Sequence, residues 1–151
     1  MTEAMHDPAP ASEKAPVHLW IIGGLALVWN LFGVFDYLAT HLQWEFYMSE
    51  FSQEQLDYFY TFPDWVVSGW AFGVWGALAG SVALLMRRRW AVWAFALSLL
   101  GMAVSSIYTL GMTNGLEIMG PEAVIFSVVI WAVQIFLIVY SYKMSQRGVL
   151  V

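Results

Sequence analysis

The chain has 151 residues, of which 60% are hydrophobic, 17% aromatic and only 11% charged. Soluble domains average about 25% charged residues, so this chain carries too few polar groups to cover a surface in water. The composition therefore predicts a one-domain integral membrane protein. The chain has no cysteine, which excludes disulfides, thiol catalysis and thiolate-bound metal centres within it.

The first 16 residues, MTEAMHDPAPASEKAP, differ in composition from the apolar sequence that follows. Pro8, Pro10 and Pro16 disfavour a helix here. The apolar run behind this segment is too long for the core of a signal peptide, and no cleavage site of small residues follows it. We therefore expect residues 1–16 to be a flexible cytoplasmic tail in front of a retained helix.

Four apolar segments are long enough to cross a bilayer, which takes about 20 residues for a hydrocarbon core of about 30 Å. Because only three residues separate the second segment from the third, these two must form an antiparallel hairpin. The predicted fold class is all-α: a transmembrane four-helix bundle, up-down-up-down, with residues 143–151 as a second cytoplasmic tail. The membrane domain covers residues 17–142, with spans 17–38, 65–86, 90–112 and 123–142.

All six basic residues fall on one side of this threading, at Lys14, Arg87, Arg88, Arg89, Lys143 and Arg147. The opposite side has acidic residues and no Lys or Arg. By the positive-inside rule both termini are cytoplasmic, and the expected location is the bacterial inner membrane. Two roles are open for the three arginines: they only set the topology, or they also bind anionic lipid head groups.

The outer link, residues 39–64, is the longest. Ser52 and Gln55 have the spacing of a capping box, which marks the start of a helix. Pro63 prevents that helix from continuing. We expect a short helix here, either lying on the outer bilayer surface or covering the bundle as a lid.

Small residues form stripes on the second and third spans. In lipid, helices associate through close contact of such residues, because burying one apolar side chain against another gains little there. The two stripes either face each other within the hairpin, or the glycine stripe is an outer face for a partner or a second copy, or it lines a channel. The second span contributes Gly69, Gly73, Gly76 and Gly80, and the third contributes Ala94, Ser98, Gly101 and Ser105.

Three polar side chains interrupt the spans. Asn30 and Gln134 lie near mid-span and are expected to hydrogen-bond across helices, to each other or toward a polar cavity. Asp36 lies near the outer end of the first span, where an interfacial carboxylate reaching water is one reading. In the other reading Asp36 is buried, and it is either held neutral, stabilised by Trp, Tyr or Asn donors, or paired with an ion, a proton or a basic group from outside the chain.

The sequence has no signature of an enzyme, a metal site or a cofactor. His41 and Glu45 are spaced i, i+4, but one histidine with scattered carboxylates is typical of a solvated acidic loop. His6, His18 and His41 all lie away from mid-membrane, so a histidine-ligated pigment is not expected. We predict no catalytic residues, no metal, no cofactor and no nucleic-acid partner.

The segments FPDWVVSGWAFGVWGALAGSVALLMRRRWA (62–91) and FALSLLGM (95–102) resemble a group of small bacterial four-span membrane proteins, some of which are labelled sugar transporters. The resemblance extends over most of the chain beyond the tail. It rests on packing and topology motifs, so it implies a fold and no site residues. The chain departs from the small sugar carriers built of three-helix repeats, because it has four spans.

Two function classes follow from these features. The first is an accessory or structural subunit that binds the bilayer and a larger membrane complex through the glycine stripe, the outer loop or Asp36. The second is a carrier of a small solute or ion, acting as a homo-oligomer. No span is broken in mid-membrane by proline, and broken helices are the best sequence indicator of a carrier site. The first class is therefore favoured at this stage.

The predicted threading is testable in a chain that has no native cysteine. Single cysteines placed at Ser52 and Ser145 are expected to react with a membrane-impermeant maleimide from opposite sides of the membrane. Labelling of both positions from the same side would contradict the up-down-up-down topology.

Overall fold

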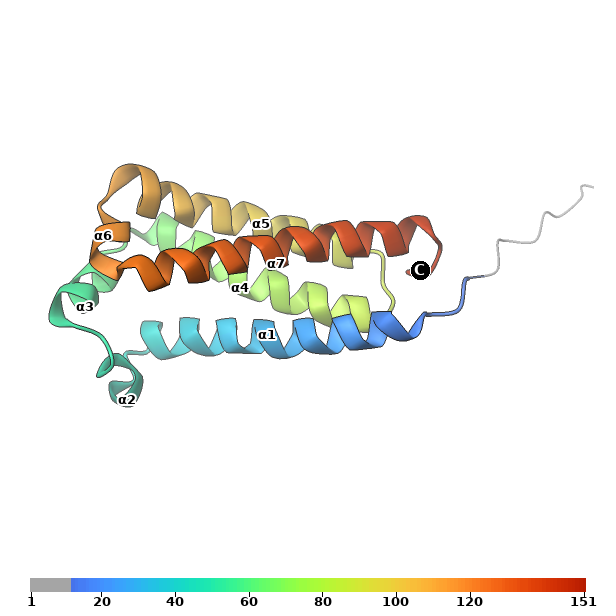
Figure 1. Ribbon diagram of the computed structural model, residues 1–151, viewed down its shortest axis with the longest axis horizontal. Coiled ribbons are helices and arrows are strands. Elements are labelled where there is room, and N and C mark those ends of the chain that lie inside the picture. The colour runs from blue at the N-terminus through green and yellow to red at the C-terminus, as the bar shows by residue number, and fades with distance from the viewer. Residues whose placement is uncertain (1–11) are drawn as a thin grey trace, which may run out of the picture.

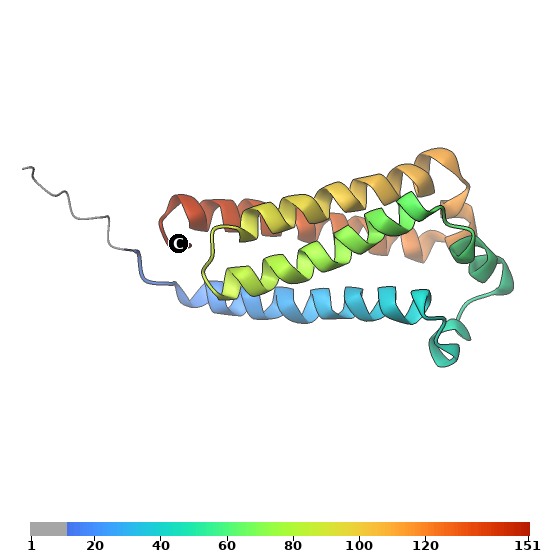
Figure 2. The same cartoon turned by 180° about the vertical axis from the view of Figure 1, so that it is seen from behind.

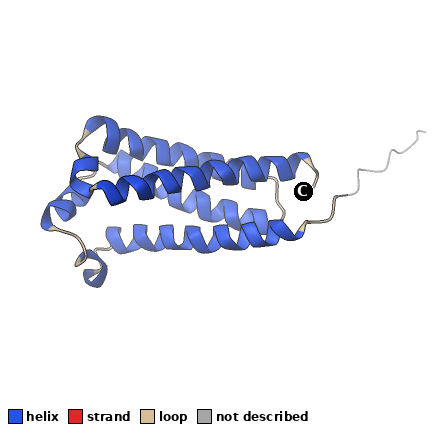
Figure 3. Ribbon diagram, in the orientation of Figure 1, coloured by secondary structure: helices blue, strands red, loops and turns tan. Residues whose placement is uncertain are grey.

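The structure, a computed structural model, describes residues 12–151, so residues 1–11 of the predicted tail lie outside the described part. Figure 3 shows that the described chain is helical, with short connecting loops. Its elements are α1 (Val17–His41), α2 (Glu45–Met48), α3 (Gln53–Tyr60), α4 (Asp64–Leu85), α5 (Ala91–Ser106), the π-helical turn η1 (Ile107–Met112), α6 (Gly115–Met119) and α7 (Pro121–Gln146).

Four helical stretches are long and apolar enough to cross a bilayer: α1, α4, α5 continued by η1, and α7. They run up-down-up-down along one axis (Figure 1), which confirms the predicted fold class of a multi-pass membrane bundle. Their bounds differ from the predicted spans by up to four residues. The largest differences are at the ends of α1 and α7, where helix continues through polar residues that a hydropathy criterion excludes.

The bundle is built outward from the α4/α5 hairpin. Helix α1 packs on α4, and α7 packs on α5. Figures 1 and 2 show α2, α3 and α6 together at one end, here called the loop end, and the carboxyl terminus near the start of α1 at the other, here called the terminal end. Within residues 12–151, α1 and α7 have no extensive packing against each other.

The glycine stripe of α4 faces α5 at backbone distance. A Cβ added to Gly69 would lie 3.0 Å from the carbonyl oxygen of Gly101, and one added to Gly76 would lie 3.1 Å from that of Ala94. Ser98 Oγ donates to the carbonyl oxygen of Gly73 at 2.5 Å. The glycine stripe therefore packs inside the hairpin, which is one of the three alternatives that the sequence left open.

At the remaining stripe positions the contacts are of the same kind. Gly80 lies under the ring of Phe95, which would be 2.7 Å from an added Cβ. Ser105 Oγ donates to the carbonyl oxygen of Val66 at 3.1 Å. Close contact thus continues along most of the hairpin, as expected where helices associate without a hydrophobic driving force.

The predicted short helix of the outer loop is α3, and its capping box is confirmed. Ser52 Oγ accepts from the Gln55 backbone N–H, and the Gln55 side chain accepts from that of Ser52. Gln55 also donates to the carbonyl oxygen of Ile118 at 3.2 Å, and the Tyr58 hydroxyl bonds Thr113 at 2.8 Å. These contacts dock α3 on the loop end of the bundle, which is the lid arrangement.

At the terminal end, the arginine turn holds the end of the chain. Arg87 Nε donates to the carbonyl oxygen of Val149 at 2.9 Å, and Arg89 Nε donates to that of Leu150 at 3.1 Å. Val149 and Leu150 are fully buried. Residues 147–151, predicted as part of a tail, thus close this end of the bundle, and the arginines have a structural role that the sequence did not indicate.

The close approach of α4 and α5 predicts that Gly101→Ala destabilises the protein. Its new Cβ would lie 2.5 Å from the Gly69 carbonyl oxygen and 2.7 Å from the Gly73 nitrogen, both backbone atoms. Overpacking of this kind costs about 1–3 kcal/mol, measurable as a lower midpoint of unfolding in detergent. Gly111→Ala is the matched control, because its Cβ would meet nothing within 4 Å. Equal effects of the two substitutions would contradict the packing argument.

Candidate ligand-binding cavity

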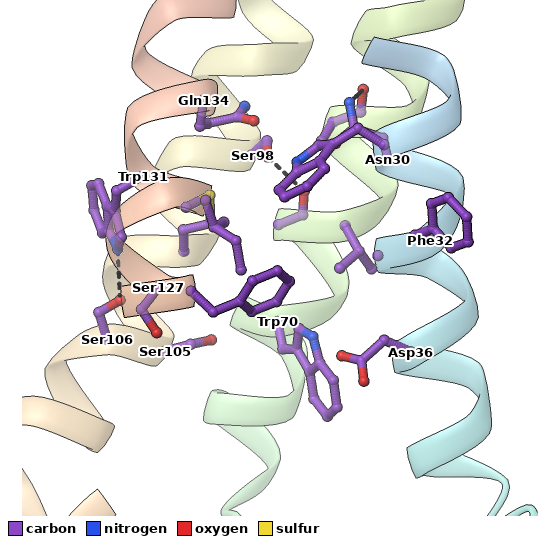
Figure 4. A pocket seen from close by; sticks show the side chains of 18 of the residues that line it. Asn30, Phe32, Asp36, Trp70, Ser98, Ser105, Ser106, Ser127, Trp131 and Gln134 are labelled. Atoms are coloured by element: carbon purple, nitrogen blue, oxygen red, sulfur yellow. Dashed lines mark hydrogen bonds between the residues drawn. The ribbon is translucent and has the colours of Figure 1, made fainter. Parts of the chain in front are cut away.

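A cavity of about 660 Å³ lies between α1, α4, α5 and α7, within the length of the spans. Figure 4 shows its polar side chains arriving from opposite walls. Its volume is in the range of small-molecule sites, about 300–1,000 Å³. Most of the lining is apolar or aromatic, and the polar residues that line it are Asn30, Asp36, Tyr47, Ser98, Ser105, Ser106, Ser127 and Gln134.

Asp36 lines this cavity toward the loop end, and its carboxylate accepts a hydrogen bond from the hydroxyl of Tyr47. Because α1 continues to His41, Asp36 is five residues from the end of the helix and lies deeper than predicted. It is partly buried. Asp36 thus faces the cavity and is stabilised by a tyrosine donor, which is one of the alternatives that the sequence analysis gave for a buried Asp36.

The loop after α1 turns back to place Tyr47 over the cavity. Gln43 adopts a left-handed conformation (φ 53°), and the Trp44 N–H donates to the carbonyl oxygen of Ala39 at 2.9 Å. The ring of Phe35 then packs edge-on against Tyr47 and Trp44, with ring centroids 5.6 and 5.8 Å apart. This aromatic cluster fixes α2 against the end of α1, since edge-to-face pairs favour a defined geometry.

Burial and the hydrogen bond to Asp36 raise the pKa of Tyr47 above its ordinary value. The phenol therefore stays protonated throughout the physiological pH range and acts as a donor. A donor fixed on one carboxylate oxygen holds the Asp36 side chain in place. The remaining acceptor positions of the carboxylate are available toward the cavity, because an ionised carboxylate has about four lone-pair sites.

Asp36 has no basic partner within residues 12–151. The one salt bridge in this part of the chain joins Arg147 to Glu13 at the terminal end. His41, the nearest basic candidate in the sequence, stacks on the ring of Tyr37 instead. A carboxylate that faces a largely apolar cavity without a cation is electrostatically suited to a positively charged ligand.

Asn30 and Gln134 lie on opposite walls of the cavity and do not bond each other. Asn30 donates to Ser81 Oγ at 2.8 Å and to the carbonyl oxygen of Ala77 at 3.3 Å. Gln134 donates to the carbonyl oxygen of Phe95 at 3.1 Å. Each amide thus joins two helices through its nitrogen, α1 to α4 and α7 to α5, and lines the cavity as well.

A tryptophan of α7 links α7 to α5 in the wall that these two helices form. Trp131 Nε1 donates to Ser106 Oγ at 3.3 Å, just before the π-helical turn η1. π-helical turns are frequent at functional sites, because the wider backbone re-aims the side chains beside it. Trp70 on α4 lies across from Asp36 in Figure 4, so an indole face and a carboxylate border the same space.

The spacing of His41 and Glu45 does not correspond to a metal site in the described part of the chain. Within residues 12–151 no group of three or more His, Asp or Glu side chains is close enough together to hold a metal ion. Tyr47 lines the cavity and bonds Asp36, and the sequence analysis did not name it. It lies in α2, and only the turn at Gln43 brings it back over Asp36, so no spacing rule indicates it.

The chain was compared with known proteins. No protein-family model matches it, and neither curated proteins nor solved structures provide a match.

The bond between Tyr47 and Asp36 predicts a measurable coupling. Tyr47→Phe is expected to lower the free energy of unfolding by about 1.5–3 kcal/mol, the usual contribution of a hydrogen bond to a charged group. In an Asp36→Leu background the same change is expected to cost little, because its partner is gone. Unfolding of the four proteins of this double-mutant cycle in detergent provides the test, with Tyr60→Phe at an exposed position as control. Additive effects would contradict a direct bond.

Proposed function

We propose that this protein is a membrane-embedded binding protein and carrier for a small organic cation, which occupies the cavity beside Asp36. The observation that carries the proposal is a carboxylate without a basic partner that faces a large aromatic cavity. Its walls supply both parts of cation recognition. Asp36 supplies negative charge, and indole or phenyl faces attract cations through their quadrupoles.

Three features favour this solute-binding hypothesis over the accessory-subunit hypothesis. The glycine stripe, which was one candidate partner surface, is covered by α5 within the same chain. Asp36, another candidate contact, faces a cavity that the chain's own helices line. The outer loop, the third candidate, is in part occupied by the docking of α3 on the loop end.

The same proposal includes a location and an assembly. With the basic residues on the cytoplasmic side, the protein lies in the bacterial inner membrane, and its loop end and Asp36 face outward. Four spans are few for a complete transport pathway, so transport requires a homo-oligomer. Within one chain the cavity can bind a solute without a partner.

The first test is binding by purified protein in mild detergent. Phenyltrimethylammonium is expected to bind and to change tryptophan fluorescence, because Trp29, Trp70 and Trp131 line the cavity. Its neutral isostere, tert-butylbenzene, is expected to bind at least about tenfold more weakly, because it lacks the positive charge that the carboxylate and the aromatic faces attract. Asp36→Asn is expected to remove this difference while the helical circular dichroism stays unchanged.

Glu50→Gln is the matched control, because it removes one acidic charge from an exposed loop position. Native mass analysis of the same preparation reports the assembly. Equal binding of the cation and its isostere to the native protein would contradict the proposal. Co-purification of a stoichiometric partner without cation binding would favour the accessory-subunit hypothesis instead.

A further inference from the structure

A second cavity, of about 430 Å³, lies between α1 and α7 on the side of the first cavity nearer the terminal end. Its lining is apolar throughout. From α1 it includes Ile22, Leu25 and Val28, and from α7 it includes Val133 and Phe136. This is the groove left where α1 and α7 have no extensive packing within the described residues.

The two cavities adjoin. Trp29 and Phe32 line both of them. Phe32 is 67% exposed, so its ring lies at an outer edge of the bundle and not in its interior. A single molecule that extends from the polar space beside Asp36 into the α1/α7 groove passes beside Trp29 and Phe32, where the ring centroid of Phe126 on α7 lies 5.9 Å from that of Trp29.

The groove has the length of one lipid chain. From Phe32 to Ile22 the helix advances about 15 Å at 1.5 Å per residue. One leaflet of a bilayer has about the same hydrocarbon depth, half of a core of about 30 Å. The polar end of this path, at Asp36, is nearer the loop end of α1, and its apolar end, at Ile22, is five residues from the terminal end of α1.

We propose that the α1/α7 groove holds the hydrocarbon chain of a single-chain amphiphile whose cationic head group lies beside Asp36. This inference rests on the proposed function and specifies its ligand class. Charge complementarity selects the head group, since Asp36 has no basic partner within residues 12–151. The continuous apolar lining selects a linear chain, which gains dispersion contacts along the whole groove.

Such a ligand arrives from the bilayer with its head and chain already oriented as the site requires. Entry between α1 and α7 needs no opening of the α4/α5 hairpin, whose backbones are in direct contact. In the membrane the chain gains little from the hydrophobic effect, because lipid is equally apolar. Its affinity for the groove therefore depends on packing, and a substitution that narrows the groove is expected to weaken it.

The test uses the full chain in phosphatidylcholine nanodiscs and a dodecyltrimethylammonium probe with a diazirine at the end of its chain. After illumination, cross-links are mapped by mass spectrometry. Cross-links at Leu25, Val133 and Phe136 are expected, and excess unlabelled dodecyltrimethylammonium is expected to suppress them. A dodecanol probe with the same diazirine is expected to give at least about tenfold fewer suppressible cross-links, because it lacks the charge.

Three variants separate the contribution of the head group from that of the chain. Asp36→Asn is expected to reduce the suppressible cross-links of the cationic probe to the level of the dodecanol probe. Val28→Phe is expected to reduce them by narrowing the groove. Leu31→Phe is its control, because Leu31 lies on the same helix with similar exposure, 48% against 53%, and lines neither cavity.

Each contrary result has a distinct meaning. Equal suppressible cross-linking by the cationic and dodecanol probes would overturn the head-group assignment. If phenyltrimethylammonium binds in an Asp36-dependent way but no groove residue is cross-linked, the chain assignment is overturned and the proposed function stands. If neither cation binds, the proposed function fails and this inference fails with it.

Discussion

The backbone contact between α4 and α5 is the constraint on which the rest of the bundle depends. Glycines on α4 and Gly101 on α5 bring the two helices so close that a single added Cβ would meet backbone atoms of the other helix. A close central pair leaves α1 and α7 to pack on its outer sides, one on each helix. The space that remains between those outer helices is the cavity, and the central pair forms its floor.

The polar groups of the membrane interior have two roles in this arrangement. Through their nitrogens, Asn30 and Gln134 hold the outer helices on the hairpin. Such bonds are modest in membranes, about 0.6–2 kcal/mol, but they fix the two walls of the cavity at a defined rotation. Asp36 is different, because its recorded partner, Tyr47, is a donor from the loop and not a cation. A carboxyl group that faces a largely apolar cavity without a basic partner is a reason to expect a ligand.

The two ends of the bundle are closed differently. At the loop end, α3 and α6 are held by side-chain hydrogen bonds, and α2 is held by an aromatic cluster around Phe35. At the terminal end, the arginine turn bonds the backbone of the last residues. Neither of these closures covers the groove between α1 and α7. A ligand that enters this groove from the bilayer therefore does not pass through either end of the bundle.

The sequence by itself determined the class of protein, the four spans, the hairpin and the capped helix of the outer loop. Each of these depends on local composition or spacing: apolar run length, a three-residue link, and the Ser52–Gln55 pair. Only the tertiary structure decided that the glycine stripe faces α5, that Asn30 and Gln134 bond other helices, and that Tyr47 lies on Asp36. Those contacts depend on how each helix is rotated and on where the loop at Gln43 turns. Rotation and turning are set by packing between distant segments, which a pattern within one segment does not specify.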